Sequence, residues 1–329
     1  VGASALTANT TGNQNTFVGA LSGAALTEGP ANTALGFESL TADTKGQNSV
    51  AIGHHALSTQ NFTSATNTYN VAVGSQAGLS VTTGIQNTLI GGLAGDAMTT
   101  GDNNTFIGMS AGGTGVTTGS SNTSIGTAAL QSVTSGASNC AMGQDAGGSL
   151  TTGSNNLLLG HDTGLTGSPG GAQTTASNVV FLGDENITNI YAAVSSIGTS
   201  DERDKTDFTA LDLGLDFVKN LKPVTYYWDK RSKYGDKYAE DYDLNAQTPD
   251  GTHKEDWLDI GFKAQEVVAL EEAAGYTISD KTNLVSNLTA DGTQYGLKYD
   301  RFVPILVKAM QEQNALIEAL TARITTLEG

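Results

Sequence analysis

The sequence predicts a mainly β protein: a repetitive β-solenoid over residues 1–199, then an α+β domain over residues 200–329 that ends in a coiled-coil helix. Two observations predict this division. Residues 1–199 hold 33 of the 41 glycines, one basic and nine acidic residues, whereas residues 200–329 hold 15 basic and 24 acidic residues. A glycine also recurs about every 17 residues in the first region. Regions of such different chemistry form separate domains.

Each repeat of the first region closes a short apolar run with a glycine. A second glycine precedes eight of these closing glycines by seven residues, and an aliphatic residue or methionine always stands directly before the closing glycine. One solenoid coil of about 17 residues per repeat explains this pattern, because stacking buries an apolar residue that no coil can bury alone. The closing glycines are Gly2, Gly19, Gly36, Gly53, Gly74, Gly91, Gly108, Gly126, Gly143, Gly160 and Gly183.

The strand of each repeat reads like Asn104 to Gly108, Asn-Thr-Phe-Ile-Gly. Side chains alternate along a strand, so the residue before the glycine and the residue two before it share one face. A small residue such as Ala111 stands three positions after the glycine and allows close packing. The array resembles the Asn-Thr-Ala-Ile-Gly-type repeats of trimeric adhesin heads and phage fibre shafts, and this resemblance implies a trimer.

Other interpretations of the repeats are weaker. A disordered tract has no reason to keep an aliphatic residue at the same position of ten repeats. A calcium-binding solenoid needs an Asp in each turn, where this chain has Thr and Asn, so we expect no metal. The two long intervals, 53–74 and 160–183, predict surface loops that either bind a partner or are irregularities without function.

Residues 1–199 offer little for catalysis. A polysaccharide-cleaving spike needs paired carboxylates and usually aromatic platforms, but the acidic residues are scattered and Trp is missing from this region. His54, His55 and His161 follow closing glycines and are expected at the surface. Adjacent His54 and His55 would point apart on a strand, which makes them a poor metal pair. Cys140 takes a strand position and is expected to face inward as a small apolar residue.

The boundary between the two regions carries the segment Ser200-Asp201-Glu202-Arg203-Asp204-Lys205. A neutral lysine can accept the proton of a serine hydroxyl, but its reference pKa of about 10.4 must first be lowered by burial or by a nearby cation such as Arg203. Ser200 as nucleophile and Lys205 as general base would then form a Ser/Lys dyad. The spacing alone is weak evidence, because Ser and Lys five residues apart are common in surface loops.

Four ordered motifs give this segment its context. They are Ser200–Lys205, an amphipathic helix over Leu211–Leu221, the strand Lys222–Trp228, and Ile260–Val267 with the sequence Ile-Gly-Phe-Lys-Ala-Gln-Glu-Val. Together they resemble the intramolecular chaperone family first recognised at the C-termini of phage endosialidases, whose members fold a trimeric fibre and then cut themselves off. The resemblance covers about 40% of the chain. It implies a serine peptidase that acts once, in cis.

The resemblance also implies a cut between Ser200 and Asp201, with Arg203, Gln265 and Glu266 as supporting residues. Serine chemistry alone favours the bond before Ser200, because attack on that carbonyl closes a five-membered ring. Attack on its own carbonyl is strained, although attack from another chain is possible. Asp204 departs from the family, where an apolar residue often precedes the lysine, and this departure predicts slower cleavage or none.

The last helix, between Asp300 and Glu328, carries a heptad pattern that predicts a coiled coil. Pro304 fits its first turn. A helix that joins three chains in register would nucleate folding, since the strands of a trimeric solenoid gain contacts only after the chains are aligned. The predicted trimer seam consists of Leu306, Met310, Gln313, Ile317, Leu320, Ile324 and Leu327.

Charge and hydropathy exclude several functions. The net charge of −17 divides into −8 for residues 1–199 and −9 for the rest, so no basic face is expected to bind nucleic acid. The chain has no run of 18 apolar residues, so membrane insertion is not expected. No cofactor is expected either. Val1 to Leu6 resembles the second half of a repeat, so we expect the N-terminus to be an internal boundary or cut rather than the start of the protein.

The leading interpretation is a phage tail fibre or tailspike that recognises a host, and whose C-terminal domain directs trimerisation and folding before autoproteolysis releases it. The alternative is an uncleaved trimeric surface adhesin that keeps residues 200–329 as a cap, and a polysaccharide depolymerase ranks third. The expected partners are two further copies of the chain and a host cell-surface receptor, for which a glycan is one candidate. We expect folding and processing in the host cytoplasm, and function on the virion outside the cell.

Overall fold

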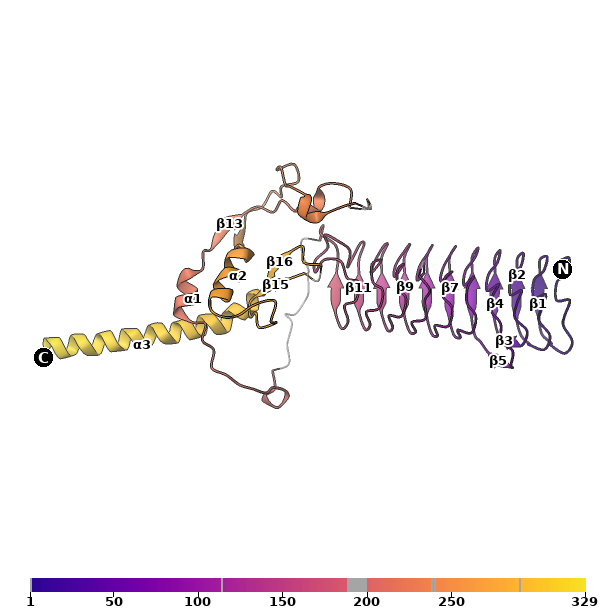
Figure 1. Cartoon of the computed structure of the whole chain (residues 1–329), viewed down its shortest axis with the longest axis horizontal. Helices are drawn as coiled ribbons and strands as arrows, with labels where there is room; N and C mark the ends of the chain where they lie inside the picture. The colour runs from indigo at the N-terminus through magenta and orange to yellow at the C-terminus, as the bar shows by residue number, and fades with distance from the viewer. Residues whose placement is uncertain (1, 114, 188–199, 238, 240, 290) are drawn as a thin grey trace. The chain divides into compact units, whose positions relative to one another are not determined.

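The computed structural model describes residues 2–113, 115–187, 200–237, 239, 241–289 and 291–329. The chain divides into two compact units, Val1–Ile187 with Lys237–Leu244, and Thr188–Asp236 with Asn245–Gly329. The first unit is a parallel β-solenoid, and the second contains the helices (Figure 1). The predicted fold class, a β-solenoid followed by an α+β region that ends in a long helix, is therefore confirmed.

Each coil of the solenoid contributes one three-residue strand to a ten-stranded parallel sheet, whose arrows lie side by side in Figure 1. Successive coils pair without a slip of register: Phe106 of one coil lies opposite Ser124 of the next, and Ile107 opposite Ile125. The strands are β1 (Thr16–Val18), β2 (Thr33–Leu35), β4 (Val50–Ile52), β6 (Val71–Val73), β7 (Thr88–Ile90), β8 (Thr105–Ile107), β9 (Thr123–Ile125), β10 (Cys140–Met142), β11 (Leu157–Leu159) and β12 (Val180–Leu182).

The central side chain of each strand points into the coil, as Leu89, Phe106 and Leu158 do with no exposed surface. The aliphatic residue before the closing glycine, which the sequence places in the core, lies outside and is half-buried or up to 48% exposed. That prediction is wrong because a period of two shows which residues share a face but not which face is buried. We call this outer column the aliphatic ladder: Val18, Leu35, Ile52, Val73, Ile90, Ile107, Ile125, Met142, Leu159 and Leu182.

Buried asparagines tie each coil to the next. The Oδ1 atom of Asn104 accepts the backbone N–H of Asn122 at 2.9 Å, and its Nδ2 atom donates to the carbonyl of Gly119 at 3.0 Å. An amide offers both a donor and an acceptor, so one side chain satisfies two buried backbone groups of the neighbouring coil. The same pair of bonds to the next coil recurs at Asn15, Asn32, Asn70, Asn87, Asn122, Asn139 and Asn156.

The closing glycines are required by backbone conformation as well as by space. Gly36 has a φ of +144°, a conformation that other residues rarely adopt. A Cβ atom at this position would also collide with the carbonyl of Gly53 in the next coil. The close stacking of coils therefore explains why the repeat ends its strand with glycine.

The first insertion folds onto the rod. Within it, β5 (Thr66–Asn67) pairs in parallel with β3 (Gly46–Gln47), and Phe62 is buried. Tyr69 stays 53% exposed, so only part of the insertion has the surface character that we expected.

Two predictions about single residues of the rod need correction. His54 and His55 lie in the turn after β4 rather than on a strand, and their ring centroids are 4.0 Å apart instead of pointing apart. Cys140 begins β10 and is half-buried, on the side opposite the buried Ala141, so it faces outward with Met142. The Cys140 prediction assigned the wrong face of the strand to the core. The histidine prediction placed on a strand two residues that belong to the turn after it.

The second unit is built from short elements around one core. Its elements are η1 (Glu202–Asp204), α1 (Leu215–Asn220), β13 (Val224–Tyr226), η2 (Arg231–Lys233), β14 (Asp259–Gly261), α2 (Ala264–Ala273), β15 (Ser286–Leu288), β16 (Tyr295–Leu297), η4 (Tyr299–Arg301) and α3 (Phe302–Glu328), while η3 (Leu244–Ala246) spans the boundary between units. The strands pair antiparallel, β13 with β14 and β15 with β16. The predicted helix over 211–221 begins later, at Leu215, directly after Gly214.

Helix α3 packs its first turns into this core through Phe302, Ile305 and Ala309. Glu312 of α3 accepts the backbone N–H of Leu215 at 2.7 Å, so it caps the start of α1. Glu271 of α2 is buried and accepts three backbone N–H groups, from Leu284, Val285 and Ser286. These polar contacts fix α1 and β15 against the two longer helices. None of the described helices combines the length and the hydropathy needed to cross a bilayer.

We expect Asn104→Ala to destabilise the rod strongly. The change leaves the N–H of Asn122 and the carbonyl of Gly119 buried without these partners, at a combined cost of about 3 kcal/mol. Urea unfolding followed by circular dichroism measures the effect as a lower midpoint. Thr127→Ala, an exposed position of the next coil, is the control. Equal midpoints for the two variants would show that the asparagine bonds do not stabilise the stack.

Candidate functional site

The segment from Ser200 to Lys205 folds back on itself through the single turn η1. Asp201 caps this turn, because its Oδ1 atom accepts the backbone N–H of Arg203 at 2.9 Å. The N–H of Lys205 closes the turn on the carbonyl of Glu202 at 3.1 Å. The turn thus returns Lys205 to Ser200, although five residues separate them in the sequence.

The two predicted catalytic residues are in direct contact. The Nζ atom of Lys205 lies 2.6 Å from the hydroxyl Oγ of Ser200 and 3.2 Å from the carbonyl oxygen of the same residue. One amine therefore contacts both a possible nucleophile and the carbonyl of the Ser200–Asp201 peptide. Such an arrangement can transfer a proton from the hydroxyl and can polarise the carbonyl. Ser200 and Lys205 are exposed in the single chain.

Arg203 pairs with Asp201 through two parallel bonds, Nε to Oδ1 at 3.0 Å and a guanidinium N–H₂ group to Oδ2 at 2.6 Å. The hydrogen bonds from Arg203 lower the pKa of the Asp201 carboxyl, and Asp201 in turn raises the pKa of Arg203. Arg203 was expected to act as a cation near Lys205, but its side chain pairs with Asp201. Its geometric role is to hold the residue on the far side of the Ser200–Asp201 bond.

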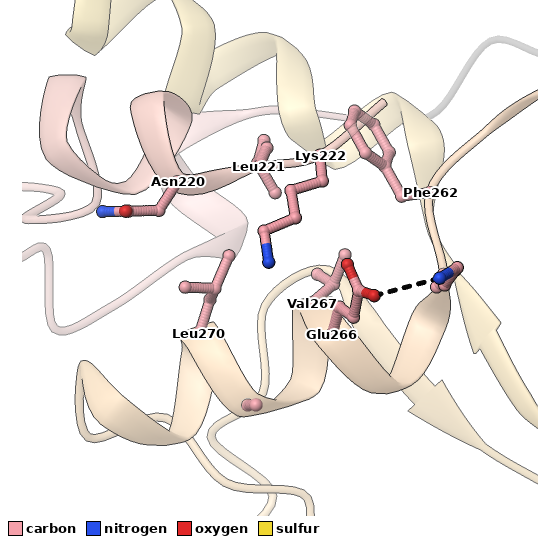
Figure 2. A pocket seen from close by; sticks show the side chains of 9 residues that line it. Asn220, Leu221, Lys222, Phe262, Glu266, Val267 and Leu270 are labelled. Carbon is pink, nitrogen blue, oxygen red and sulfur yellow. Dashed lines mark ion pairs between the residues drawn. The ribbon is translucent and has the colours of Figure 1, made fainter. Parts of the chain in front are cut away.

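The other predicted supporting residues lie on α2. Gln265 is exposed, and Glu266 forms an ion pair with Lys263 at 3.3 Å. Glu266 lines a cavity of about 290 Å³ between the end of α1 and α2, into which the side chain of Lys222 extends (Figure 2). In the part of the chain that the structure describes, no hydrogen bond or ion pair joins Gln265 or Glu266 to Ser200 or Lys205. These two residues contribute to the α2 surface and this cavity.

The predicted seam residues lie along α3 and are exposed there, from 44% for Leu306 to 84% for Leu327. Apolar side chains this exposed on a 27-residue helix form an apolar stripe, which Gln313 interrupts. The opposite side of the first turns packs into the core of the unit. The seam is therefore available to another helix.

A second charged cluster, which the sequence does not reveal, lies in the last coils of the rod. The Nζ atom of Lys237 is 2.6 Å from Asp162 Oδ2 and 2.9 Å from Glu185 Oε1. Both carboxylates are almost fully buried. Burial alone would lower the pKa of Lys237, but the hydrogen bonds to the two carboxylates outweigh it and raise the pKa above its ordinary value. The pairing therefore favours the charged amine.

His161 and Asp184 adjoin this cluster. His161 Nδ1 lies 3.2 Å from Asp162 and 3.6 Å from Asp184, and the three residues bring possible ligand atoms within 4.8 Å of one another. Burial raises the pKa of Asp184, but hydrogen bonds from Asn186 and the charge of Lys237 outweigh this effect and lower it overall. His161 is exposed, as predicted. One signal could have identified the cluster: Asp145, Asp162 and Glu185 all stand two residues after a closing glycine.

The comparisons with known proteins concern the second region. Residues 200–276 match the model of the family described as chaperone of endosialidase, which is of the self-cleaving peptidase type. The match begins at Ser200 and includes Lys205, α1, α2 and Lys237, but not α3. Neither the comparison with curated proteins nor the comparison with solved structures gave a match. The chain therefore combines a β-solenoid with a segment similar to the intramolecular chaperones of endosialidases.

Proposed function

We propose that this protein is a phage tail fibre or tailspike for host recognition, whose C-terminal domain directs trimerisation and folding and is then cut from the rod at Ser200/Asp201. The contact of Lys205 with both the hydroxyl and the carbonyl of Ser200 carries the proposal. It occurs in the first residues of the segment that matches the endosialidase chaperones. A solenoid rod preceding such a domain supports a fibre-like or spike-like protein.

Cleavage proceeds with Ser200 as nucleophile and Lys205 as general base. The neutral amine takes the hydroxyl proton while the oxygen attacks the carbonyl carbon, and the C–N bond to Asp201 then breaks as its nitrogen accepts that proton. Water hydrolyses the resulting ester and leaves a carboxylate at Ser200. The bond from Lys205 to the Ser200 carbonyl favours the Ser200/Asp201 peptide over the bond before Ser200, whose residue Thr199 lies outside the described residues.

Assembly would control the timing of this reaction. Ser200 and Lys205 are exposed in the single chain, whereas a lysine acts as a base only when burial or a nearby cation keeps its amine neutral. Packing of neighbouring copies around the segment supplies that burial. Attack by the Ser200 hydroxyl of a neighbouring copy is the alternative to attack in cis, because it avoids the strained four-membered ring that Ser200 would form with its own carbonyl. Cleavage then follows assembly.

Two apolar surfaces support the homotrimer. One is the seam of α3, and the other is the aliphatic ladder, which repeats at every coil on the outer face of the sheet. Burying a half-exposed aliphatic side chain contributes about 1 kcal/mol, so ten rungs and a helical seam make a substantial interface. A second copy aligned in the same register presents its own aliphatic ladder with the same distance between rungs, so that the two ladders match. The assembled rod carries its receptor-binding surface, for which a glycan is one candidate, on the virion outside the cell.

An uncleaved trimeric adhesin is the second candidate function. The acidic Asp204 favours it, because in the chaperone family that the segment resembles an apolar residue often precedes the lysine. In that case residues 200–329 stay as a permanent cap. The following measurement distinguishes the two functions.

We expect the expressed chain to split into a rod and a fragment of 129 residues, from Asp201 to Gly329, and Ser200→Ala and Lys205→Met to remain whole. Removing the hydroxyl removes the nucleophile, and removing the amine removes the base. Mass spectrometry of the intact chains under denaturing conditions shows whether each chain is cut and at which bond. Lys219→Met, an exposed lysine on α1, is the control and should be cut like the original chain. An unsplit original chain would favour the adhesin, and a 130-residue fragment would move the cut to before Ser200.

We expect Ile317→Lys with Ile324→Lys to prevent trimer formation, because two charges per helix would be buried in the seam. The matched control is Ala315→Lys with Ala322→Lys, which adds the same charge at exposed positions off the seam. Light scattering after size exclusion should give one chain mass, 33.7 kDa, for the seam variant and three for the control, where cleavage is blocked by Ser200→Ala. Trimers of both variants would exclude α3 as the assembly helix.

A further inference from the structure

We propose that the described residues of 237–244, which are Lys237, Ala239 and 241–244 and are called here the latch segment, hold the cleaved C-terminal fragment on the last coils of the rod, so that breaking the Ser200–Asp201 bond does not by itself release it. The inference rests on the proposed self-cleavage. The latch segment belongs to the compact unit of the solenoid, although it follows the cleavage site in the sequence and lies within the stretch that matches the endosialidase chaperones. After cleavage it would connect the fragment to the rod without a covalent bond.

Side chains of the latch segment and of the rod both contribute to the contact between them. Lys237 inserts its amine between Asp162 and Glu185, at 2.6 and 2.9 Å, and keeps only 18% of its side chain exposed. The two carboxylate side chains are 1% and 6% exposed. At the other end of the latch segment, Leu244 is buried as well. A lysine held this way differs from a surface ion pair, which solvent and salt weaken.

The rod needs this lysine for an electrostatic reason. Asp162 and Glu185 occupy the same position of two successive coils, two residues after Gly160 and Gly183, so stacking brings two like charges together. Asp184 adds a third carboxylate nearby. Lys45 is the single Lys or Arg in residues 1–199 and pairs with Glu28, so no such side chain of the rod's own sequence is near these carboxylates. Withdrawing Lys237 would leave buried carboxylates without their cation, which opposes release.

The position of the cluster also fits a terminal cap. The last coil of a solenoid has no following coil to pair with, and such ends are usually covered. The acidic residues Asp145, Asp162, Asp184 and Glu185 gather in the last coils, where the latch segment lies in the same unit. The latch therefore acts as a cap supplied by the domain that the cleavage separates from the rod.

The test compares denaturing and native measurements on the full chain. Denaturing mass reports whether the bond is cut, and native size exclusion reports whether the 129-residue fragment still travels with the rod. Lys237→Met keeps the length of the side chain and removes its charge. We expect the original protein to be cut but to elute as one species, and the variant to lose its fragment roughly 100-fold faster after dilution.

Lys233→Met is the matched control, since Lys233 is half-buried four residues earlier and should retain its fragment. Asp162→Asn with Glu185→Gln tests the same contact from the rod side and covers the case in which Lys237→Met does not fold. Release from the original protein upon cutting, or equal retention by Lys237→Met, would overturn the latch. If the chain does not cut itself, a protease recognition sequence at positions 195–199 separates the two parts, and the same native comparison decides.

Discussion

The rod depends on the amide bonds that each buried asparagine makes to the next coil. A coil of about 17 residues has too little apolar surface to fold alone, so its backbone groups must find partners one coil away. The coil that carries Ser49 in place of asparagine shows how strict this requirement is. There Gln60 extends across the interior to Asp43 at 2.6 Å and to Asn70 at 2.8 Å, and Ser49 itself bonds to Thr68. A different set of polar side chains thus replaces the missing amide.

Because each coil depends on bonds to the next coil, the end of the rod differs from its interior. Among the described residues β12 is the last strand of the stack, and Asp162, Asp184 and Glu185 gather in the coils next to it. Buried carboxylates destabilise a fold unless a cation compensates them. Lys237 provides that charge from a segment of the second region. The charge balance of the last described coils therefore depends on a residue that follows the proposed cleavage site, and this dependence supports the latch proposed above.

The 17-residue repeat and the hydrophobic spacing predicted most of the fold, because the same pattern recurs in every coil of the rod and in every heptad of the last helix. Ten of the eleven closing glycines follow a strand of the sheet, and the heptads predict α3. The sequence could not show that Phe106 faces inward and Ile107 outward, since both are apolar and alternate. The contact of Ser200 with Lys205 was a prediction based on motifs, but the turn that creates it depends on a cap at Asp201. Lys237 stayed hidden because its partners Asp162 and Glu185 lie more than 50 residues away.

The buried central position and the outer position of the strands differ in how much they vary from coil to coil. This difference favours the assembly of several copies. The central, buried position varies from Phe106 to Ser124 and Ala141, because the opposite wall of the coil compensates changes in volume with residues such as Leu130 and Leu150. The outer position stays aliphatic or Met in all ten strands, although solvent would tolerate any polar residue there. An outer column that is more uniform than the core is explained if it is itself a packed surface. Copies of the rod aligned by α3 would meet along that surface, bury the segment around Ser200 and only then permit its cleavage.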